Sequence, residues 1–338
     1  MILTLFIFTT LVSYALSILL ELLFKKLQWF IDTPSKRSTH STPVPSAGGL
    51  AILFSYVLYI ISLSFIQEID KNILFILLFF LLPVMLIGLI DDLKETKILI
   101  RLVIQFISAS LLIYYFQINT NLAPELIITQ SSFLIISLSI VLSVWLMNLY
   151  NFMDGIDGYA SSQAVFIFAT ASLLAYINNP EENIYLYLIG FAFANLGFLF
   201  RNWYPAKIFM GDTGSVSIGF IIAFFIFYSA SESVISIYTW LILLSIFISD
   251  ATYTLFVRAV TKKNLTKPHL THGFHILTKS KKSQVNITKY LIFFNIFWVL
   301  PLAFISNTFI EFHILVTIVT YIPLLFLLLK IGAGLENE

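Results

Sequence analysis

Four amide and carboxylate side chains recur at intervals of three residues in the segment Asn148-Leu-Tyr-Asn-Phe-Met-Asp-Gly-Ile-Asp-Gly158. The segment follows one apolar run and precedes another, so Asn148, Asn151, Asp154 and Asp157 fall on one side of a helix end. Its glycines allow a ligand to approach the backbone closely. A polar turn between spans is the alternative, but ionisable groups at a hydrocarbon boundary favour a functional site.

A second polar segment, residues 201–215, carries Asp212 between two glycines at the expected start of an apolar run. Backbone N–H groups at a helix N-terminus can hold phosphate oxygens, and a carboxylate beside them can take a hard cation. The alternative is a simple helix cap with Asp212 as the capping residue. Phosphate chemistry with a divalent cation is the functional interpretation of this segment.

An adjacent acidic pair, Asp91 and Asp92, ends another apolar run. Neighbouring carboxylates repel each other, and a bound Mg²⁺ would relieve that repulsion. Arg101 and Gln105 lie one turn apart at the start of the next run, where they could reach the same site. A solvated helix end for the two acids and an interfacial anchor for Arg101 are the alternatives.

Histidines and basic residues supply the remaining candidates. His269, His272 and His275 stand at spacing three in a loop rich in lysine. This pattern could bind zinc on a helix, but contact with phosphate fits better beside an all-oxygen site for a hard cation. A second basic loop leads into a Gly-Gly helix start, which suits an anion. Its candidate side chains are Lys36, Arg37 and His40.

The elements that position these loops are apolar runs long enough to cross a bilayer. Hydrophobic residues make up 59% of the 338 residues and charged residues 11%, whereas globular proteins have about 45 to 50% and about 25%. Each crossing takes about 20 apolar residues. We therefore predict an all-α integral membrane protein, a single polytopic domain over residues 1–338 with no soluble domain. The eleven predicted spans are residues 1–23, 48–66, 73–90, 98–117, 132–149, 160–177, 184–200, 216–230, 236–257, 288–306 and 312–331.

The distribution of basic residues predicts the orientation, because cytoplasmic loops carry the Lys and Arg excess. Alternate loops hold 18 of the 19 basic residues, with Lys71 as the exception. This places the N-terminus outside, the C-terminus in the cytoplasm and nearly all Asp and His residues at one cytoplasmic site. The first span is not a cleaved signal peptide, because Lys25 and Lys26 follow it without a small-residue cleavage pattern. A net charge of +1 argues against nucleic-acid binding, and the lack of Cys excludes disulfides and thiolate sites.

Taken in order along the chain, these motifs resemble the polyprenyl-phosphate N-acetylhexosamine-1-phosphate transferases of glycosyltransferase family 4. The matching patterns are D-x-P-x-x-R-x-x-H-x-x-P-x-P-x-x-G-G, I-D-D, N-x-x-N-F-M-D-G-I-D-G, N-x-x-P-A-K-I-F-M-G-D-T-G-S and the His-rich loop. The resemblance implies transfer of a sugar-1-phosphate from a UDP-N-acetylhexosamine to undecaprenyl phosphate, with release of UMP. It also implies Mg²⁺, or Mn²⁺ in its place, as cofactor, a bacterial inner membrane and a homodimer.

The motifs and the resemblance together assign roles to individual side chains. Asp212 and Asp91 are the expected metal ligands, and the expected catalytic residues are Asp91, Asp92, Asp154 and Asp157. The separated pair His269 and His272 resembles the transferases that initiate O-antigen-like lipopolysaccharide, whereas the peptidoglycan lipid I synthase has a contiguous His run. The expected substrate-binding residues are Lys36, Arg37, His40, Arg101, Asn148, Asn151, Asn202, Lys207, His269 and His272.

Two alternatives to this activity remain open at the level of sequence. An ion-coupled secondary transporter would also have buried acids and broken helices, but its site would lie near the bilayer midplane. A catalytically inactive scaffold is disfavoured because each acid of the motifs is present. Within the enzyme interpretation, direct attack by the lipid phosphate and a two-step route through an aspartyl-phosphate both fit the residues.

Overall fold

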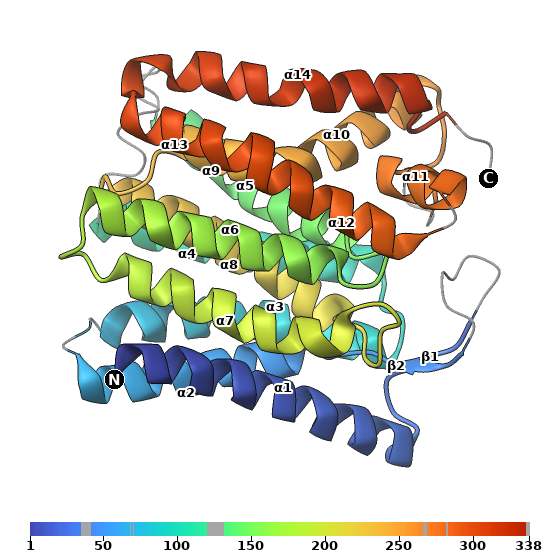
Figure 1. Ribbon diagram of the computed structural model, residues 1–338, viewed down its shortest axis with the longest axis horizontal. Coiled ribbons are helices and arrows are strands. Elements are labelled where there is room, and N and C mark those ends of the chain that lie inside the picture. The colour runs from blue at the N-terminus through green and yellow to red at the C-terminus, as the bar shows by residue number, and fades with distance from the viewer. Residues whose placement is uncertain are drawn as a thin grey trace.

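The computed structural model describes residues 1–34, 42–67, 69, 71–119, 132–265, 269–281 and 283–335. Its helices run side by side as a bundle, and a short antiparallel hairpin lies at one end (Figure 1). The all-α fold class is therefore confirmed. The elements are α1 Ile2–Leu27, β1 Ile31–Asp32, β2 Val44–Pro45, α2 Gly49–Ile66, α3 Lys71–Leu93, α4 Ile98–Asn119, α5 Ser132–Phe152, α6 Tyr159–Asn178, α7 Ile184–Asn202, α8 Gly211–Ser231, α9 Ile237–Leu243, α10 Ser245–Val260, α11 Gly273–Lys281, α12 Gln284–Phe294, the π-turn η2 Asn295–Val299, α13 Leu300–Thr308, the 3₁₀ turn η3 Ile310–Phe312 and α14 His313–Ile331.

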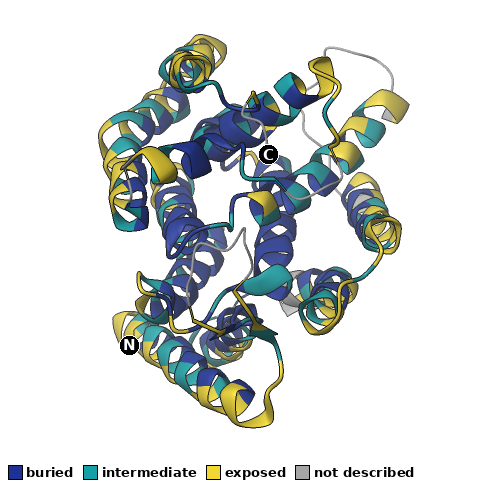
Figure 2. Cartoon of the chain, turned by 90° about the vertical axis from the view of Figure 1, so that its right-hand side faces the viewer, coloured by how far each residue is buried: buried dark blue, intermediate teal, exposed yellow. Residues whose placement is uncertain are grey.

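The prediction of a multi-pass membrane protein is confirmed. Ten helical segments of the described chain are long and apolar enough to cross a membrane, and the bent pair α9 and α10 forms an eleventh. Exposed residues lie around the outside of the bundle and buried residues at its centre (Figure 2). Large apolar side chains stand on the outer surface, among them Phe65, Phe75 and Phe133 with 85%, 78% and 79% of their area exposed. Such a surface suits hydrocarbon as its solvent.

Helix α8 is the central helix of the bundle. Every residue from Thr213 to Ala230 is buried, as expected for a helix that is apolar all round. It packs against α2, α3, α4 and α5. Glycines permit this close approach: a Cβ on Gly49 of α2 would lie 2.1 Å from the Cα of Gly214, and one on Gly219 would lie 2.5 Å from a carbonyl oxygen of α5. The neighbours of α8 are thereby fixed around its polar first turn.

The ninth predicted span, residues 236–257, is present but is broken into the two helices α9 and α10. The chain bends by 76° between α9 and α10, at Leu244. The amide of Gln163 donates to the carbonyl oxygen of Leu243 over 3.1 Å, and Asn295 in turn donates to Gln163 over 2.6 Å. These side chains satisfy a backbone group at the bend, which is what a break inside a membrane requires. Neither Pro nor Gly marks the bend in the sequence.

Two other boundaries differ from the prediction for local reasons. Helix α8 begins at Gly211 and not at residue 216, because its first turn is polar but donates hydrogen bonds to Asp92 of α3, as described below. The tenth span contains the π-turn η2 immediately before α13. Pro301, near the start of α13, has no N–H to continue the regular ladder of hydrogen bonds.

Candidate active site

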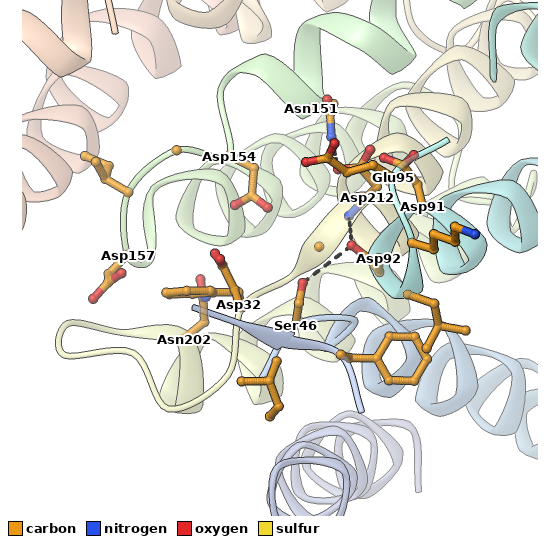
Figure 3. A pocket seen from close by; sticks show the side chains of 18 of the residues that line it. Asp32, Ser46, Asp91, Asp92, Glu95, Asn151, Asp154, Asp157, Asn202 and Asp212 are labelled. Carbon is orange, nitrogen blue, oxygen red and sulfur yellow. Dashed lines mark hydrogen bonds between the residues drawn. The ribbon is translucent and has the colours of Figure 1, made fainter. Parts of the chain in front are cut away.

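Seven carboxylates surround a cavity of about 560 Å³ at the end of the bundle where the hairpin and α11 lie. We call it the acidic cavity. Its walls come from the hairpin, from the C-terminal ends of α3 and α5, from the loop after α5 and from the first turn of α8. Figure 3 shows the side chains of Asp154 and Asp32 directed into this space. The seven acids are Asp32, Asp91, Asp92, Glu95, Asp154, Asp157 and Asp212.

Asp92, at the end of α3, caps the N-terminus of α8. Its Oδ1 accepts the backbone N–H of Asp212 at 2.8 Å, and its Oδ2 accepts the N–H and the hydroxyl of Thr213 at 3.0 and 2.5 Å. A carboxylate is favoured here by the unpaired N–H groups and the dipole of the helix. Gly211 has φ of 72°, and a Cβ there would lie 2.5 Å from Asp92. The cap of α8 therefore comes from another helix, and the alternative in which Asp212 is the capping residue does not describe this turn.

Arg101 of α4 joins the other two acids of this cluster. One of its guanidinium nitrogens, Nη1, lies 2.6 Å from Oδ2 of Asp91 and 2.6 Å from Oδ2 of Asp212. The Asn151 amide donates to the remaining oxygen of Asp212 over 2.7 Å. Thr96 donates its N–H and its hydroxyl to Asp91. Arg101 thus links α3, α4 and α8 through charge-assisted hydrogen bonds, which are about twice as strong as neutral ones.

Asp154 lies in the loop between α5 and α6 and also lines the acidic cavity. Burial raises the pKa of its carboxyl group well above the ordinary value, and the nearby carboxylates of Asp212, Asp92 and Asp157 raise that pKa further. Both effects disfavour another negative charge in this space. A cation in the cavity would act against them.

The oxygen donors of the acidic cavity suit a hard divalent cation such as Mg²⁺. Asp212 and Asp91 already share the charge of one guanidinium, and the acids around them outnumber the cations. Among the described residues, no three His, Asp or Glu side chains converge as a complete metal cage. Mg²⁺ is commonly held by one or two carboxylates together with water and substrate phosphates, so the residues present fit it.

Asp157 and Asn202 lie on the cavity wall, where their side chains form hydrogen bonds with backbone groups and with Ser161. Asp157 accepts the N–H of Ala206 at 2.9 Å. Asn202 accepts the N–H of Gly158 and the hydroxyl of Ser161, and it donates to a carbonyl oxygen of its own loop. These bonds tie the loop after α5 to the loop after α7. Both residues therefore fix the relative position of two loops that form the cavity wall.

A second cavity of about 530 Å³ adjoins the first and has mostly apolar walls from α4, α5 and α10. We call it the apolar cavity. Asn151 and His275 line both cavities, so the two spaces meet at these side chains. Asn148 lies in the apolar cavity and donates to Gln105 over 2.7 Å. The apolar residues that line it are Ile98, Leu102, Phe106, Val141, Val144, Trp145, Phe152, Leu255 and Leu265.

The His loop, residues 269–275, lines both cavities: His269 and His272 face the apolar cavity, and His275 faces both. It enters helix α11 only at Gly273, so the helical spacing needed for zinc is absent between His269 and His272. Their rings stack instead, with centroids 4.9 Å apart, and His272 Nδ1 lies 3.3 Å from Asp250. Burial, together with neighbouring positive charge, lowers the pKa of His275 to about 3, so this imidazole is neutral at physiological pH.

The other expected site residues are distributed unevenly. Lys36, Arg37 and His40 lie outside the described residues. Lys207 is exposed on the loop before α8 and lines neither cavity. The sequence assigns no role to two of the seven acids that line the acidic cavity. Asp32 stands at the head of the first matched motif, which was the signal for it, while Glu95 follows the acidic pair without any distinguishing pattern.

Replacement of Asp157 by an apolar residue should destabilise the protein more than replacement by the neutral amide Asn. Asp157→Leu leaves the buried N–H of Ala206 unpaired, which costs about 1 to 3 kcal/mol. Asp157→Asn keeps an oxygen that can accept this bond and serves as the matched control. The free energy of unfolding in detergent micelles measures the difference. Equal unfolding free energies for the two variants would show that the bond does not stabilise the site.

Comparison with known proteins adds a family to this geometry. Residues 74–230, which run from α3 to α8, match the model of glycosyl transferase family 4. The chain is 28% identical over 252 residues to a probable undecaprenyl-phosphate N-acetylglucosaminyl 1-phosphate transferase of Bacillus subtilis (strain 168), covering 73% of this chain and 69% of that protein. It is 36% identical over 191 residues to a phospho-N-acetylmuramoyl-pentapeptide-transferase of Wolbachia pipientis wMel, covering 52% of this chain and 57% of that protein. The match thus spans little more than half of the Wolbachia relative. The resemblance stated from the motifs is confirmed.

Proposed function

Because residues 74–230 belong to glycosyl transferase family 4, we propose that this membrane protein is a sugar-1-phosphate transferase. It moves N-acetylhexosamine-1-phosphate from a UDP-sugar to undecaprenyl phosphate and releases UMP. The observation that carries the proposal is the junction of an acidic cavity with an apolar cavity at Asn151 and His275. A charged donor and a lipid acceptor must meet at such a junction. The excess of basic residues in the loops at this end of the bundle favours the cytoplasmic face as the site of the reaction.

The donor diphosphate occupies the acidic cavity in this proposal. An anion enters a space lined by seven acids only if cations compensate, which is the reason to include Mg²⁺. Asp212 and Asp91 would hold the ion, and Mn²⁺ would be its substitute. Bound there, the ion would neutralise charge on the transferred phosphoryl group, the main requirement of phosphoryl transfer. Asn151 holds the carboxylate of Asp212 in place, and Arg101 orients both acids.

The lipid phosphate is the nucleophile. Asp91 or Asp92 accepts the proton of this phosphate, and the freed oxygen attacks the β-phosphorus of the UDP-sugar. The bond between that phosphorus and the bridging oxygen breaks, so UMP leaves and a diphosphate-linked sugar remains on the lipid. Arg101 and the first turn of α8 keep both carboxylates fixed during this step, since positioning contributes most of the catalysis in such reactions.

Direct attack predicts no covalent enzyme intermediate. Incubation of the purified protein with Mg²⁺ and a UDP-sugar labelled in the β-phosphate, without acceptor lipid, should leave the protein unlabelled and release no UMP. Labelled protein formed in step with UMP would establish the aspartyl-phosphate route instead. Addition of undecaprenyl phosphate to the same sample provides the positive control.

The separation of His269 from His272 favours an initiating transferase of an O-antigen-like polysaccharide over a peptidoglycan enzyme. Relatives of both kinds are found, a probable N-acetylglucosaminyl 1-phosphate transferase and phospho-N-acetylmuramoyl-pentapeptide-transferases. The test substrates are therefore UDP-N-acetylhexosamines and UDP-N-acetylmuramoyl-pentapeptide, supplied separately. Turnover with the pentapeptide substrate alone would overturn the preference.

The transporter alternative draws on one observation, the bend between α9 and α10. Transporter sites place ionisable groups at such breaks. The amides of Gln163 and Asn295 satisfy the break in this protein, and the acids lie together at one end of the bundle. The positions of the acids therefore favour the enzyme.

Asp212→Asn should reduce UMP release by about 100-fold or more, because a metal ligand that stabilises the transition state contributes several kcal/mol. Chelation of divalent ions should stop UMP release by the native protein, and addition of Mg²⁺ or Mn²⁺ should restore this activity. The measurement is UMP release by purified protein with undecaprenyl phosphate and the separate UDP-sugars. Glu232→Gln, at the opposite end of α8, is the matched control and should keep full activity. Native protein inactive with every UDP-sugar would defeat the proposal.

A bulky residue in the apolar cavity should weaken acceptor binding selectively. Leu102→Trp places an indole where the prenyl chain is proposed to lie, and we expect the KM for undecaprenyl phosphate to rise about 10-fold, as overpacking by about 1 to 3 kcal/mol implies. The KM for the UDP-sugar should stay unchanged. Leu99→Trp, on the exposed side of the same helix, is the control. An equal rise in both KM values for Leu102→Trp would contradict this assignment of the apolar cavity.

A further inference from the structure

The segment that follows α14, Gly332–Leu335, folds back against the protein. Gly332 is left-handed with φ of 69° and ends the helix, and the N–H of Ala333 donates to the carbonyl oxygen of Leu328 over 3.1 Å. Ala333 is fully buried in a small apolar cluster with Ile276 of α11 and Leu328 of α14. A glycine at this position ends a helix without strain, and the reversal directs the chain toward the His loop.

One backbone hydrogen bond connects this segment to the His loop. The N–H of Gly334 donates to the carbonyl oxygen of Thr271 over 2.9 Å. Thr271 lies between the two stacked histidines, and its hydroxyl oxygen is 3.0 Å from Nδ1 of His269. Arg258, buried in α10, donates to the same hydroxyl over 3.3 Å. Thr271 is therefore held by the terminal segment through its backbone and by α10 through its side chain.

The segment is itself locked onto α10. Gly334 has φ of 81°, and a Cβ there would lie 2.8 Å from the carbonyl oxygen of Thr254 and 2.9 Å from Val257. Only glycine fits a backbone that combines this conformation with such close approach. Lys263 donates its ammonium to the carbonyl oxygen of Leu335 over 2.6 Å. Contacts on both sides of Gly334 thus fix the N–H group that reaches Thr271.

The far side of the His loop is fixed by different contacts. Both carboxylate oxygens of Asp250 accept backbone N–H groups at the start of α11, from Gly273 at 2.7 Å and Phe274 at 2.9 Å. A Cβ on Gly155 would lie 2.8 Å from the ring of His275, so the loop also fits closely against the wall of the acidic cavity. The loop is held at its helix end by Asp250 and at Thr271 by the terminal segment.

We propose that Gly332–Leu335 is a positioning element of the transferase, which holds the His loop against the apolar cavity so that His269 and His272 face the acceptor lipid phosphate. This inference rests on the proposed function and adds residues 332–335 to the parts of the protein that support the reaction. The segment touches neither cavity and acts through Thr271. Its release would let the two histidines move away from the acceptor while the walls of the acidic cavity from α3, α5 and α8 stay in place.

The test is a comparison of variants that displace the segment with one that preserves it. Gly334→Val strains the left-handed backbone and collides with α10, and Ala333→Leu overfills the small cluster. Each should raise the KM for undecaprenyl phosphate and lower kcat by about 10-fold, because small misplacements of binding groups are costly. The KM for the UDP-sugar should remain at the native value. Leu335→Ala keeps the backbone contacts of the segment and should behave as the native protein.

Amide hydrogen exchange separates this inference from the proposed function, since it needs no turnover. In Gly334→Val and Ala333→Leu, exchange at residues 269–275 should accelerate at least about 10-fold over the native rate, with α1 unchanged as an internal reference. If both variants exchange amide hydrogens in the His loop at the native rate, the positioning role is wrong, even if the enzyme is active. Equal rises in both KM values, in step with a general loss of stability, would overturn it as well. If the native protein is inactive but the variants still show faster exchange at residues 269–275, the proposed transferase function is wrong. The contact between the terminal segment and the His loop is then still supported.

Discussion

The acids of this protein must lie close together inside a bundle that is otherwise apolar. Asp91 and Asp92 come from α3, Asp212 from α8 and Asp154 from the loop after α5, and all four line one cavity. Their mutual repulsion is opposed by two fixed features: the guanidinium of Arg101 between Asp91 and Asp212, and the N–H groups of α8 that bind Asp92. The positions of three helices depend on this balance, because loss of Arg101 would leave two partly buried carboxylates without their shared cation.

Helix α8 serves both the fold and the cavity. Its length is buried among the surrounding helices, and its glycines permit backbones to approach. Its first turn is polar, so the same packing that stabilises the bundle carries Asp212, and the N–H groups that bind Asp92, to the cavity wall. The cap comes from Asp92 on another helix, which leaves the oxygens of Asp212 to Arg101, to Asn151 and to a ligand. A fixed arrangement of this kind suits phosphoryl transfer, where preorganised charge provides most of the catalysis.

Two cavities of different polarity meet where Asn151 and His275 stand. Hydrogen bonds from loop to loop build the acidic side, as with Asn202, which joins the segments after α5 and α7. The apolar side depends on the His loop, whose residues are held by α10 and by the segment after α14. In the proposed function, the charged donor would stay in the acidic cavity and the prenyl chain of the acceptor in the apolar cavity. The reacting phosphates would meet where the two cavities join.

The sequence by itself determined the eleven spans, the all-α fold, and the loops that hold the acids, because apolar length and charge are properties of contiguous residues. It also identified Asp91, Asp154 and Asp212 as neighbours through their motifs. Only the tertiary structure decided that Asp92 caps α8, that Asn202 bonds to the loop after α5, and that the ninth span bends at Leu244. Each of these depends on partners far apart in the chain: 120 residues separate Asp92 from Asp212, and the bend is satisfied by side chains from α6 and η2. A hydrogen bond between distant segments leaves no periodic trace in either, so packing alone reveals it.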